Sequence, residues 1–426
     1  MKTLIKNGYI VTKDNELNQV DVWIEQGKIK GIGQFEKENI EFEQVIDAKK
    51  GLITPGFVDV HVHFREPGFE YKETIETGSA SAARGGFTTV CAMPNLKPVP
   101  DNKETLEMIN NKIKSDSKIK ILQYASITKD LNSEELVDFK ALKEAKAFAF
   151  TNDGVGVQTA GTMYLAMQEA AKLDMAIVAH TEDESLLFGG VMHKGEISEK
   201  LGLPGIMSAT ESSQIARDVL LAQETGVHYH VCHVSTKESV EVIRQAKKHG
   251  IHVTCEVCPH HLIMTDNDIT HDHGNFKMNP PLRANEDQQA LINGLLDGTI
   301  DCIATDHAPH SCCEKNQSMI DSPFGIVGSE TAFKLMYTHF VETGRFTLEQ
   351  VVYWMSEAPS RIFKLDTGTL NIGSAADIAI FDLETETTIE DDFLSKSSNT
   401  PFIGDKVKGD TLYTLVDGNL VWHKGE

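Results

Sequence analysis

The sequence lacks several features that would assign it to a class of protein at once. It has no apolar run near the roughly 20 residues that a membrane-spanning helix needs. Its first residues, MKTLIKNGYIVTKDNE, have no signal-peptide core, so we expect no secretion signal. Seven cysteines are scattered over 426 residues. An odd number of cysteines in a long chain favours reduced thiols in a cytoplasm over a disulfide framework.

Basic residues are also scarce. The chain has 40 Lys and Arg against 63 Asp and Glu, which gives a formal net charge of -23. This balance argues against nucleic acid and anionic membranes as main partners, but it does not exclude a small anionic substrate, because local charge decides that. Hydrophobic residues make up 40% and charged residues 24% of the chain, as in ordinary globular proteins. The length allows one large domain and a smaller one.

Both ends of the chain have the pattern of short strands joined by turns. Residues 1–50 include TLIKNGYIV and DVWIEQGKIKGIG, with turn dipeptides at Asn7-Gly8 and Gln26-Gly27. From about Leu365 the runs ADIAIFDL and TLYTLVDGNLVWHKG have the same character. Neither end has enough apolar residues to fold alone. We therefore predict one small β-sandwich domain built from residues 1–54 and 363–426.

The middle of the chain, residues 55–362, alternates between strand-like and helix-like segments. Eight apolar runs are separated by stretches with helical spacing; the runs are GFVDVHVH, FTTVCAMP, KIKILQYASI, KAFAFTN, MAIVAH, HYHVCHVS, HVTCEVCP and DCIATDHA. This α/β pattern predicts a (β/α)8 TIM barrel. A doubly wound open sheet is the main alternative, but we find no Gly-rich phosphate loop to support it.

The first barrel strand, in GFVDVHVHFR (residues 56–65), ends in two histidines. His61 and His63 are two positions apart, so in an extended chain both imidazoles leave the same face and can reach one metal ion. Arg65 follows on the same side, with a planar fork suited to a carboxylate. Taken alone, the two histidines are as well explained by simple alternation with valine.

Other strands of the predicted barrel end in residues of the same kind, and barrel active sites lie at these carboxyl ends. The predicted metal ligands are His61, His63, Asp153, His180, His233 and Asp306. Such a set suits two divalent ions of the zinc class. We expect His61, His63 and Asp306 to hold one ion, His180 and His233 the other, and Asp153 to bridge them.

That arrangement predicts a reaction. Two ions about 3.5–4 Å apart would share a water whose pKa falls to around 7, which supplies hydroxide at neutral pH. Asp306 is then the candidate for a general base that takes the proton and later gives it to a leaving nitrogen. This is chemistry for opening or closing an amide.

Several motifs along the whole chain carry a family resemblance. They are DVHVHFREPG (59–68), AMPN (92–95), TNDGVGVQ (151–158), VAHTED (178–183), CHVST (232–236), CEVCPHHL (255–262), KMNPPLR (277–283), ATDHAPH (304–310) and PFGIVGSET (323–331). With them the chain resembles the amidohydrolase superfamily, and within it the dihydroorotase family of the bacterial type related to the Bacillus enzymes. The family interconverts N-carbamoyl-L-aspartate and L-dihydroorotate in pyrimidine synthesis.

The resemblance implies roles for further residues. The family's metal ligands map onto the six residues named above, with Asp306 as the catalytic acid and base. Its substrate contacts map onto Arg65, Asn95, Asn279 and His310, with the backbone of Phe324 and Gly325 closing on the ring. A bidentate cation and amide donors suit the free α-carboxylate of such a substrate. The resemblance also implies a homodimer and leaves open an association with aspartate transcarbamoylase.

Two alternatives remain open at this point. Hydantoinases and allantoinases resemble this family but bridge their metals with a carboxylated lysine at the end of the fourth strand. Here that strand ends in Asp153, and Lys146 stands at its beginning. A shorter bridge leaves the filling of the second metal site open. The other alternative is a non-catalytic scaffold for aspartate transcarbamoylase, which the presence of all six ligands disfavours.

One further motif has a functional and a structural interpretation. Cys255 and Cys258, followed by His260 and His261, look like half of a zinc knuckle, but the chain has no second CxxC. Because Cys255 and Val257 alternate with polar neighbours along a strand, barrel packing is the better interpretation. The two histidines then lie at the rim, where they can position the loop that carries Asn279.

Overall fold

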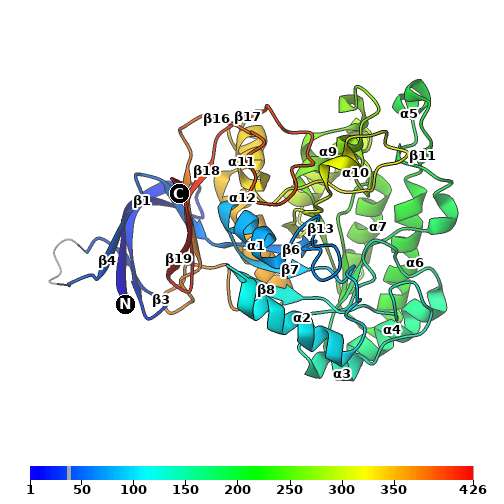
Figure 1. The fold of residues 1–426 in the computed structure, drawn as a ribbon, viewed down its shortest axis with the longest axis horizontal. Coiled ribbons are helices and arrows are strands. Elements are labelled where there is room, and N and C mark those ends of the chain that lie inside the picture. The colour runs from blue at the N-terminus through cyan, green and yellow to red at the C-terminus, as the bar shows by residue number, and fades with distance from the viewer. Residues whose placement is uncertain (36–39, 426) are drawn as a thin grey trace.

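The computed structural model describes residues 1–35 and 40–425 of the chain. Figure 1 shows two parts, with a small sheet that contains both chain termini on one side and a larger barrel with its surrounding helices on the other. The α/β class with a TIM barrel and a β-sandwich formed by both ends is confirmed. The N-terminal and C-terminal segments of the chain lie in the same sheet, because one strand from each segment hydrogen-bonds to the other.

The small part is one sheet whose strands follow the order β19-β18-β15-β5-β1-β2-β3, with β4 also beside β1. The bounds of these strands are β1 (Lys2–Val11), β2 (Leu17–Glu25), β3 (Lys28–Gly33), β4 (Gln44–Asp47), β5 (Leu52–Pro55), β15 (Ile378–Asp382), β18 (Asp410–Val416) and β19 (Asn419–His423). The antiparallel pairing of β5 with β15 joins the two chain ends. The sheet encloses its own apolar core, which includes Ile5, Val22, Ile53 and Ile380.

The larger part is a ring of parallel strands. The bounds are β6 (Phe57–Val62), β7 (Phe87–Ala92), β8 (Lys120–Gln123), β9 (Ile177–Ala179), β12 (Tyr229–Val231), β13 (Val253–Val257) and β14 (Cys302–Ile303). These strands pair in two runs, β6-β7-β8 and β9-β12-β13-β14. Parallel bridges through Phe150, to Ala125 and to Ile177, join the runs on one side. A bridge between Val62 and His307 closes the ring on the other.

The fourth position of the ring differs from a regular strand. The sequence predicts a strand over KAFAFTN, but the structure has only isolated bridges at Phe150 there. Its hydrogen bonds are nevertheless made: the Phe148 amide donates to Gln123 O at 2.9 Å and the Thr151 amide to Ala125 O at 3.0 Å. The segment begins at Lys146, whose φ of 72° lies in the left-handed region and turns the chain away from the preceding helix, Phe139–Glu144.

Helices connect the barrel strands and cover them. Their bounds are α1 (Ile75–Arg84), α2 (Lys103–Asp116), α3 (Phe139–Glu144), α4 (Ala160–Lys172), α5 (Glu196–Leu201), α6 (Ala209–Thr225), α7 (Lys237–Lys248), α8 (Pro259–Ile263), α9 (Asn285–Leu296), α10 (Cys312–Lys315), α11 (Ala332–Met336), α12 (Leu348–Met355) and α13 (Glu357–Ile362). Shorter turns of helix are Glu184–Leu186, Asp266–Asp268, Gly274–Phe276 and Tyr337–Val341. Two small strand pairs complete the fold, β10 (Met192–His193) with β11 (Gly205–Ile206) and β16 (Thr387–Thr388) with β17 (Lys406–Val407).

Helix α7 illustrates why these segments are helical. Thr236 begins it by accepting a hydrogen bond from the Ser239 amide, which satisfies one of the free donors of the first turn. Val240, Ile243 and Ala246 recur at helical spacing and are buried against the strands. The polar residues between them face solvent. The helix is therefore held by one apolar face and a side-chain cap.

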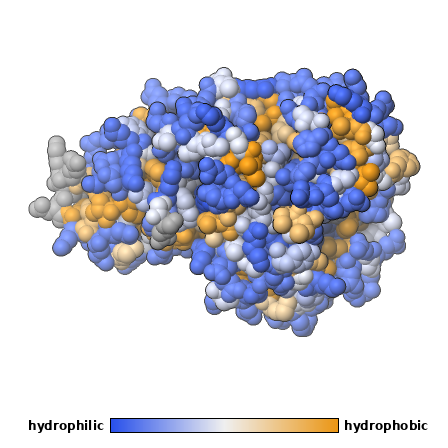
Figure 2. Space-filling model, turned by 45° about the horizontal axis from the view of Figure 1, so that its top comes forward, coloured by the Kyte–Doolittle hydropathy of each residue, from blue (hydrophilic) through white to orange (hydrophobic). Residues whose placement is uncertain are grey.

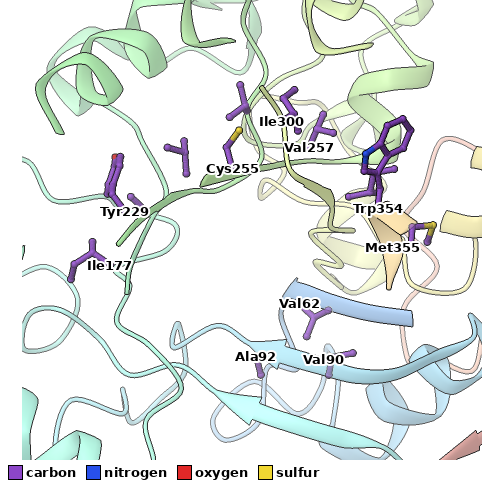
Figure 3. Packing of buried hydrophobic residues seen from close by; sticks show 14 of the residues in the cluster. Val62, Val90, Ala92, Ile177, Tyr229, Cys255, Val257, Ile300, Trp354 and Met355 are labelled. Carbon is purple, nitrogen blue, oxygen red and sulfur yellow. The ribbon is translucent and has the colours of Figure 1, made fainter. Parts of the chain in front are cut away.

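The main apolar core lies between the strands and the helices. In Figure 3 the labelled side chains come from strands around the ring, from the turn before β14 and from α12; they are Val62, Val90, Ala92, Ile177, Tyr229, Cys255, Val257, Ile300, Trp354 and Met355. All of them are buried. Burial of such side chains stabilises the fold by roughly 1.5–3 kcal/mol each, before the entropy of ordering them is counted. This layer fixes the strands that carry the candidate site.

The surface has the character expected from the net charge. Figure 2 shows a face on which hydrophilic residues predominate and apolar residues form smaller, separate groups. In residues 1–35 and 40–425, no helix combines the length and the apolar character that crossing a membrane requires.

Candidate active site

The six predicted metal ligands meet at the carboxyl ends of the barrel strands. His61 lies in β6, His63 directly follows that strand, and Asp306 comes after β14. Nε2 of His63 lies 3.0 Å from Oδ1 of Asp306, and Nε2 of His61 lies 3.3 Å from the same oxygen. Ligands that are 243 or more residues apart in the chain thus face one another across the closure of the ring.

The remaining ligands complete the cluster around Asp153. Its Oδ1 lies 3.3 Å from Nε2 of His61, 3.7 Å from Nδ1 of His180 and 3.9 Å from Nε2 of His233. Its Oδ2 lies 3.5 Å from Nε2 of His63. Asp153 is therefore at the centre of the imidazoles, where a carboxylate has the position to bridge two cations.

The donor set fits divalent cations. Oδ1 of Asp153 and Nε2 of His61 are buried, and neither makes a hydrogen bond within the described part of the chain. Potential ligand atoms lie within 4.8 Å of one another in the groups His61, His233, Asp306 and Asp153, His180, His233. Lone pairs left without donors in a buried, polar place are what a cation would satisfy, and imidazole with carboxylate suits zinc-class ions.

The imidazoles and carboxylates of the cluster shift one another's pKa values. Burial disfavours a charged His61, but the carboxylates of Asp153 and Asp306 outweigh it and raise the pKa of this imidazole well above its usual value. Burial also acts against ionised Asp153, yet His61 and the neighbouring imidazoles lower the pKa of this carboxyl well below its usual value. Burial, with His180 nearby, holds the pKa of His233 well below its usual value, so this ring is uncharged at neutral pH.

Three residues of the site have backbone conformations that residues other than glycine rarely adopt. Arg65, His233 and Asp306 have φ values of 50°, 29° and 49°. A non-glycine residue with positive φ is uncommon, and such strain collects at functional sites where the surrounding structure enforces it. Here each residue turns the chain at or just beyond a strand end. The strain is thus part of what aims these side chains into the mouth of the barrel.

A cavity of about 170 Å³ opens above the cluster. Every predicted site residue except His61, which is fully buried beneath, lines this cavity. The lining therefore combines the metal-ligand cluster with the residues predicted to hold substrate: Arg65, Asn95, Asn279, His310, Phe324 and Gly325.

Arg65 supplies the positive charge of the cavity wall. Its Nε donates to Pro309 O at 3.2 Å, which fixes the guanidinium. Burial lowers the pKa of Arg65 to about 10, so it is still charged at neutral pH. The arrangement offers a desolvated, fixed cation to an anionic group of a ligand.

His310 lies beside Arg65 and is held by both ring nitrogens. Nε2 donates to the carbonyl of Phe324 at 2.8 Å, and Nδ1 accepts from Lys72 Nζ at 3.1 Å, so the proton is assigned to Nε2 by these partners. Burial together with the cations of Arg65 and Lys72 lowers the pKa of His310 far below its usual value. His310 is therefore a neutral side chain that fixes the position of Phe324.

The two predicted asparagines contact ligands of the cluster. Asn95 Oδ1 lies 2.8 Å from Nδ1 of His63, and its Nδ2 donates to Asp153 Oδ2 at 3.3 Å. Asn279 donates to Glu182 Oε2 at 2.6 Å and lies 3.5 Å from Nε2 of His180. Both amides thus connect the metal-ligand cluster to the cavity wall.

Glu256 is a residue of the site that sequence reasoning missed. It is completely buried, and its Oε1 lies 2.6 Å from Nδ1 of His61 while Oε2 lies 3.1 Å from Nε2 of His230. His61 and the bond from His230 outweigh burial and lower the pKa of Glu256 to about 2. A carboxylate on the far nitrogen of a metal-binding histidine orients the ring and fixes its tautomer.

A signal for Glu256 was present in the sequence. Cys255 and Val257 belong to the apolar core, so the residue between them leaves the opposite face of β13, toward the barrel interior. A charged residue inside a barrel strand needs a partner there.

The zinc-knuckle motif divides in the structure. Cys255 belongs to the apolar core, as expected, whereas potential ligand atoms of Cys258, His260 and His261 are buried within 4.8 Å of one another. His261 Nε2 donates to Pro280 O at 2.9 Å, next to Asn279. This hydrogen bond is consistent with the predicted role of His261 in holding the loop that carries Asn279.

Comparisons with known proteins agree with the geometry. Residues 50–239 match a family model described as "Dihydro-orotase-like". A protein of Enterococcus faecalis named dihydroorotase is 69% identical over 423 residues, 99% of each chain, and one of Listeria monocytogenes is 58% identical over 99% of each chain.

Solved structures of related enzymes share the fold. An L-hydantoinase from Arthrobacter aurescens has a TM-score of 0.88 at 28% identity, over 100% of this chain and 96% of its own. A D-hydantoinase has a TM-score of 0.86 at 26% identity over the same shares. The sequence similarity to the dihydroorotases is much higher and extends over nearly the full length. The chain belongs to the dihydroorotase family of amidohydrolases.

Proposed function

We propose that the chain interconverts N-carbamoyl-L-aspartate and L-dihydroorotate, with water released on ring closure, as a step of pyrimidine synthesis. The observation that carries this proposal is one cavity in which a buried cluster of imidazoles and carboxylates lies beside a fixed arginine. The full-length likeness to relatives named dihydroorotase supports it over other cyclic amides.

We further propose zinc as the cation, held by His61, His63, Asp153, His180, His233 and Asp306. Buried lone pairs without donors on His61 and Asp153 support a cation of this class. One or two ions per subunit are compatible with the donor set, with Asp153 as the bridge. When bound, such ions polarise an amide carbonyl and lower the pKa of water.

The residues of the chain have separate tasks in this proposal. The guanidinium of Arg65 grips the α-carboxylate of the substrate. It is held in place by Pro309 O, which accepts from Nε, and by His310 Nε2, which lies 3.3 Å from Nη2. Asn279 and the backbone at Phe324 and Gly325 face the ureide edge of the ring. Asp306 takes the proton from the attacking water during ring opening and gives it to the leaving ring nitrogen; ring closure reverses both transfers.

Asp153 takes the place of the lysine bridge that hydantoinases resembling this chain use. Lys146 is exposed and precedes the fourth strand position, so it is at the opposite end of that strand from Asp153. The absence of a lysine at the bridging position favours dihydroorotase over hydantoinase or allantoinase.

Several broader properties are part of the same proposal. We propose domains with the limits 1–54, 55–362 and 363–426. We also propose that the chain forms a homodimer, which can associate with aspartate transcarbamoylase. A cytoplasmic setting is supported by the seven cysteines, all of which are free thiols.

The test is a side-by-side assay of ring opening with dihydroorotate, hydantoin and allantoin, together with metal analysis of the purified protein. We expect turnover of dihydroorotate only, in both directions, and one or two zinc ions per chain. Faster ring opening of hydantoin or allantoin than of dihydroorotate would favour hydantoinase or allantoinase activity. A folded protein that binds no metal and turns over none of the three would be a scaffold instead.

A further inference from the structure

Lys315 is a fully buried cation that no step of the proposed reaction uses. It ends helix α10, and only 1% of its surface is exposed. Its Nζ donates to three backbone carbonyls, Lys277 O at 2.9 Å, Pro323 O at 2.9 Å and Gly325 O at 2.7 Å. An ammonium has three donors, so this one is satisfied entirely by the backbone.

The three carbonyls belong to the two segments that form one wall of the cavity. Lys277 is two residues before Asn279, and Pro323 and Gly325 flank Phe324. Asn279, Phe324 and Gly325 all line the cavity. One ammonium therefore joins the segment after β13 to the segment after β14.

Other contacts also link or hold these two segments of the wall. The Gly325 amide donates to Lys277 O at 3.0 Å, and Lys277 Nζ lies 4.4 Å from the centre of the Phe324 ring. Asn399, which belongs to the segment between β16 and β17, donates to Gly325 O at 3.0 Å and to Ala308 O at 3.1 Å. Gly325 O thus receives two donors, from Lys315 and from Asn399.

The space around Gly325 leaves little freedom to this wall. Its φ is 130°, and a Cβ there would lie 2.6 Å from Cβ of Ala308. A small displacement of the segment therefore has to be taken up by the hydrogen bonds that hold it. Those bonds converge on Lys315.

The three hydrogen bonds of Lys315 offset the free-energy cost of burying its amine. Burial lowers the pKa of Lys315 to about 7, and Lys277, Arg65 and Lys72 act in the same direction, whereas Glu314 opposes them. A buried charge is retained only where its hydrogen bonds compensate the lost hydration. Three carbonyls within 2.9 Å provide that compensation.

We propose that Lys315 is a positioning residue for substrate: its ammonium ties the Asn279 segment to the Phe324 segment and so sets the shape of the wall against which the ring is held. The inference rests on the proposed function for its effect on substrate, but not for its effect on the unliganded protein. Lys315 touches no metal ligand among its hydrogen-bond partners, so metal binding is separate from this role.

The experiment compares Lys315→Met, which keeps the length of the side chain but removes the charge, with Lys315→Arg, which keeps the charge. A planar fork cannot direct three donors from one atom to three carbonyls. Lys364→Met, at a side chain that is 75% exposed, is the matched control. We expect KM for dihydroorotate to rise by about 10- to 100-fold in Lys315→Met and by a smaller factor in Lys315→Arg, with kcat changed less and zinc content unchanged.

A second measurement does not depend on activity. Hydrogen exchange of the unliganded protein reports the Gly325 amide, which donates to Lys277 O, and the Tyr9 amide in the small sheet as an internal reference. We expect exchange at the amides of residues 324–326 to accelerate by about tenfold or more in Lys315→Met, while exchange at Tyr9 stays at the wild-type rate.

Two results would overturn the proposal. One is exchange at Gly325 and KM both within about twofold of wild type in Lys315→Met. The other is loss of zinc or a general rise in exchange over the whole chain in both variants, which would make Lys315 a residue of overall folding. If wild type turns over no dihydroorotate, the proposed function fails, and the local exchange still decides whether Lys315 holds the wall.

Discussion

The two ends of the barrel both collect histidines around a cavity, but they differ in what those histidines face. At the carboxyl ends of the strands, His61, His63, His180 and His233 surround Asp153 and Asp306. At the opposite end, His228 and His252 stack with ring centres 4.3 Å apart, and His228 Nε2 lies 2.8 Å from Thr254 Oγ1.

Cavity volume does not indicate which end is the candidate active site, because the larger cavity is at the opposite end. The one near His228 and His252 has a volume of about 300 Å³, against about 170 Å³ at the mouth. The difference is in charge and in hydrogen bonding. Imidazoles at the mouth converge on carboxylates and leave buried atoms without donors, whereas those at the other end pair with a hydroxyl and with one another. Convergence on carboxylates, not the number of histidines, distinguishes the candidate metal site.

Asp306→Asn should have the largest effect. Under the proposed function, Asn keeps one oxygen for the metal, so we expect zinc to stay bound while the group that moves the proton is lost. We expect kcat to fall by about 10²- to 10⁴-fold in both directions. Steady-state assays with zinc analysis would check this. The control is Asp301→Asn, at the other end of the same strand, where the carboxylate binds Lys247 at 2.6 Å. Normal turnover in Asp306→Asn would rule out its role.

Glu256→Gln tests the residue that connects the two ends, because its carboxylate contacts both His61 and His230. Loss of the negative charge behind His61 should weaken zinc binding by about 10- to 100-fold. Competition with a chelator would measure it. Thr254→Val, which breaks only the hydroxyl contacts of His228 and His230, should leave zinc affinity within about twofold. Equal losses in both variants would remove the distinction between the ends.

Arg65→Ala should chiefly raise KM, since one charge-assisted contact to the substrate carboxylate is lost. We expect a factor of about 10–100 in KM with a smaller change in kcat, from initial rates over a range of substrate concentrations. Arg361→Ala is the matched control, because that arginine lines the cavity at the opposite end and its side chain is 69% exposed. A similar rise in KM in Arg361→Ala would contradict a special role for Arg65.

The smallest effect concerns stability at the end away from the site. Burial, with His230 and His252 nearby, lowers the pKa of His228 to about 3 in the folded chain. Its unfolded pKa is about 6.5, so between these values the unfolded chain binds the extra proton and stability falls as pH falls. His228→Gln should therefore lose less stability than wild type between pH 7.5 and 5, by roughly 1–2 kcal/mol.

Urea unfolding at both pH values would check the His228 prediction, with His271→Gln in an exposed loop as control. Identical acid sensitivity in wild type and His228→Gln would show that the imidazole near Thr254 is not the group that titrates. Such a result would weaken the comparison by removing the cost of keeping these histidines neutral.

Much of the mouth could be predicted because its signals are local. Apolar runs of strand length end in HVH, TND, VAHTED, VCH and ATDH, and parallel strands in a ring place such ends together. The irregular fourth strand did not prevent this, because Asp153 follows the run whether or not the segment pairs over its full length. The division of the ligands between two ions stays a prediction.

Partners that come from different segments could not be predicted in the same way. Lys315 lies in HSCCEKN, and nothing in this segment indicates three backbone carbonyls around its ammonium. Asn399 belongs to a segment that the sequence assigned to the small domain, yet it bonds to Ala308 and Gly325 at the barrel rim. Both depend on loops whose paths follow no period.

The sequence by itself determined the alternation of strands and helices and the identity of the residues at each strand end. It did so because periodicity and side-chain direction depend on neighbours along the chain. Only the tertiary structure decided which groups meet: Glu256 behind His61, Lys72 on His310, and Lys315 between two loops. These contacts arise from closing the ring and packing irregular segments over its mouth, where distances in space are unrelated to distances along the chain.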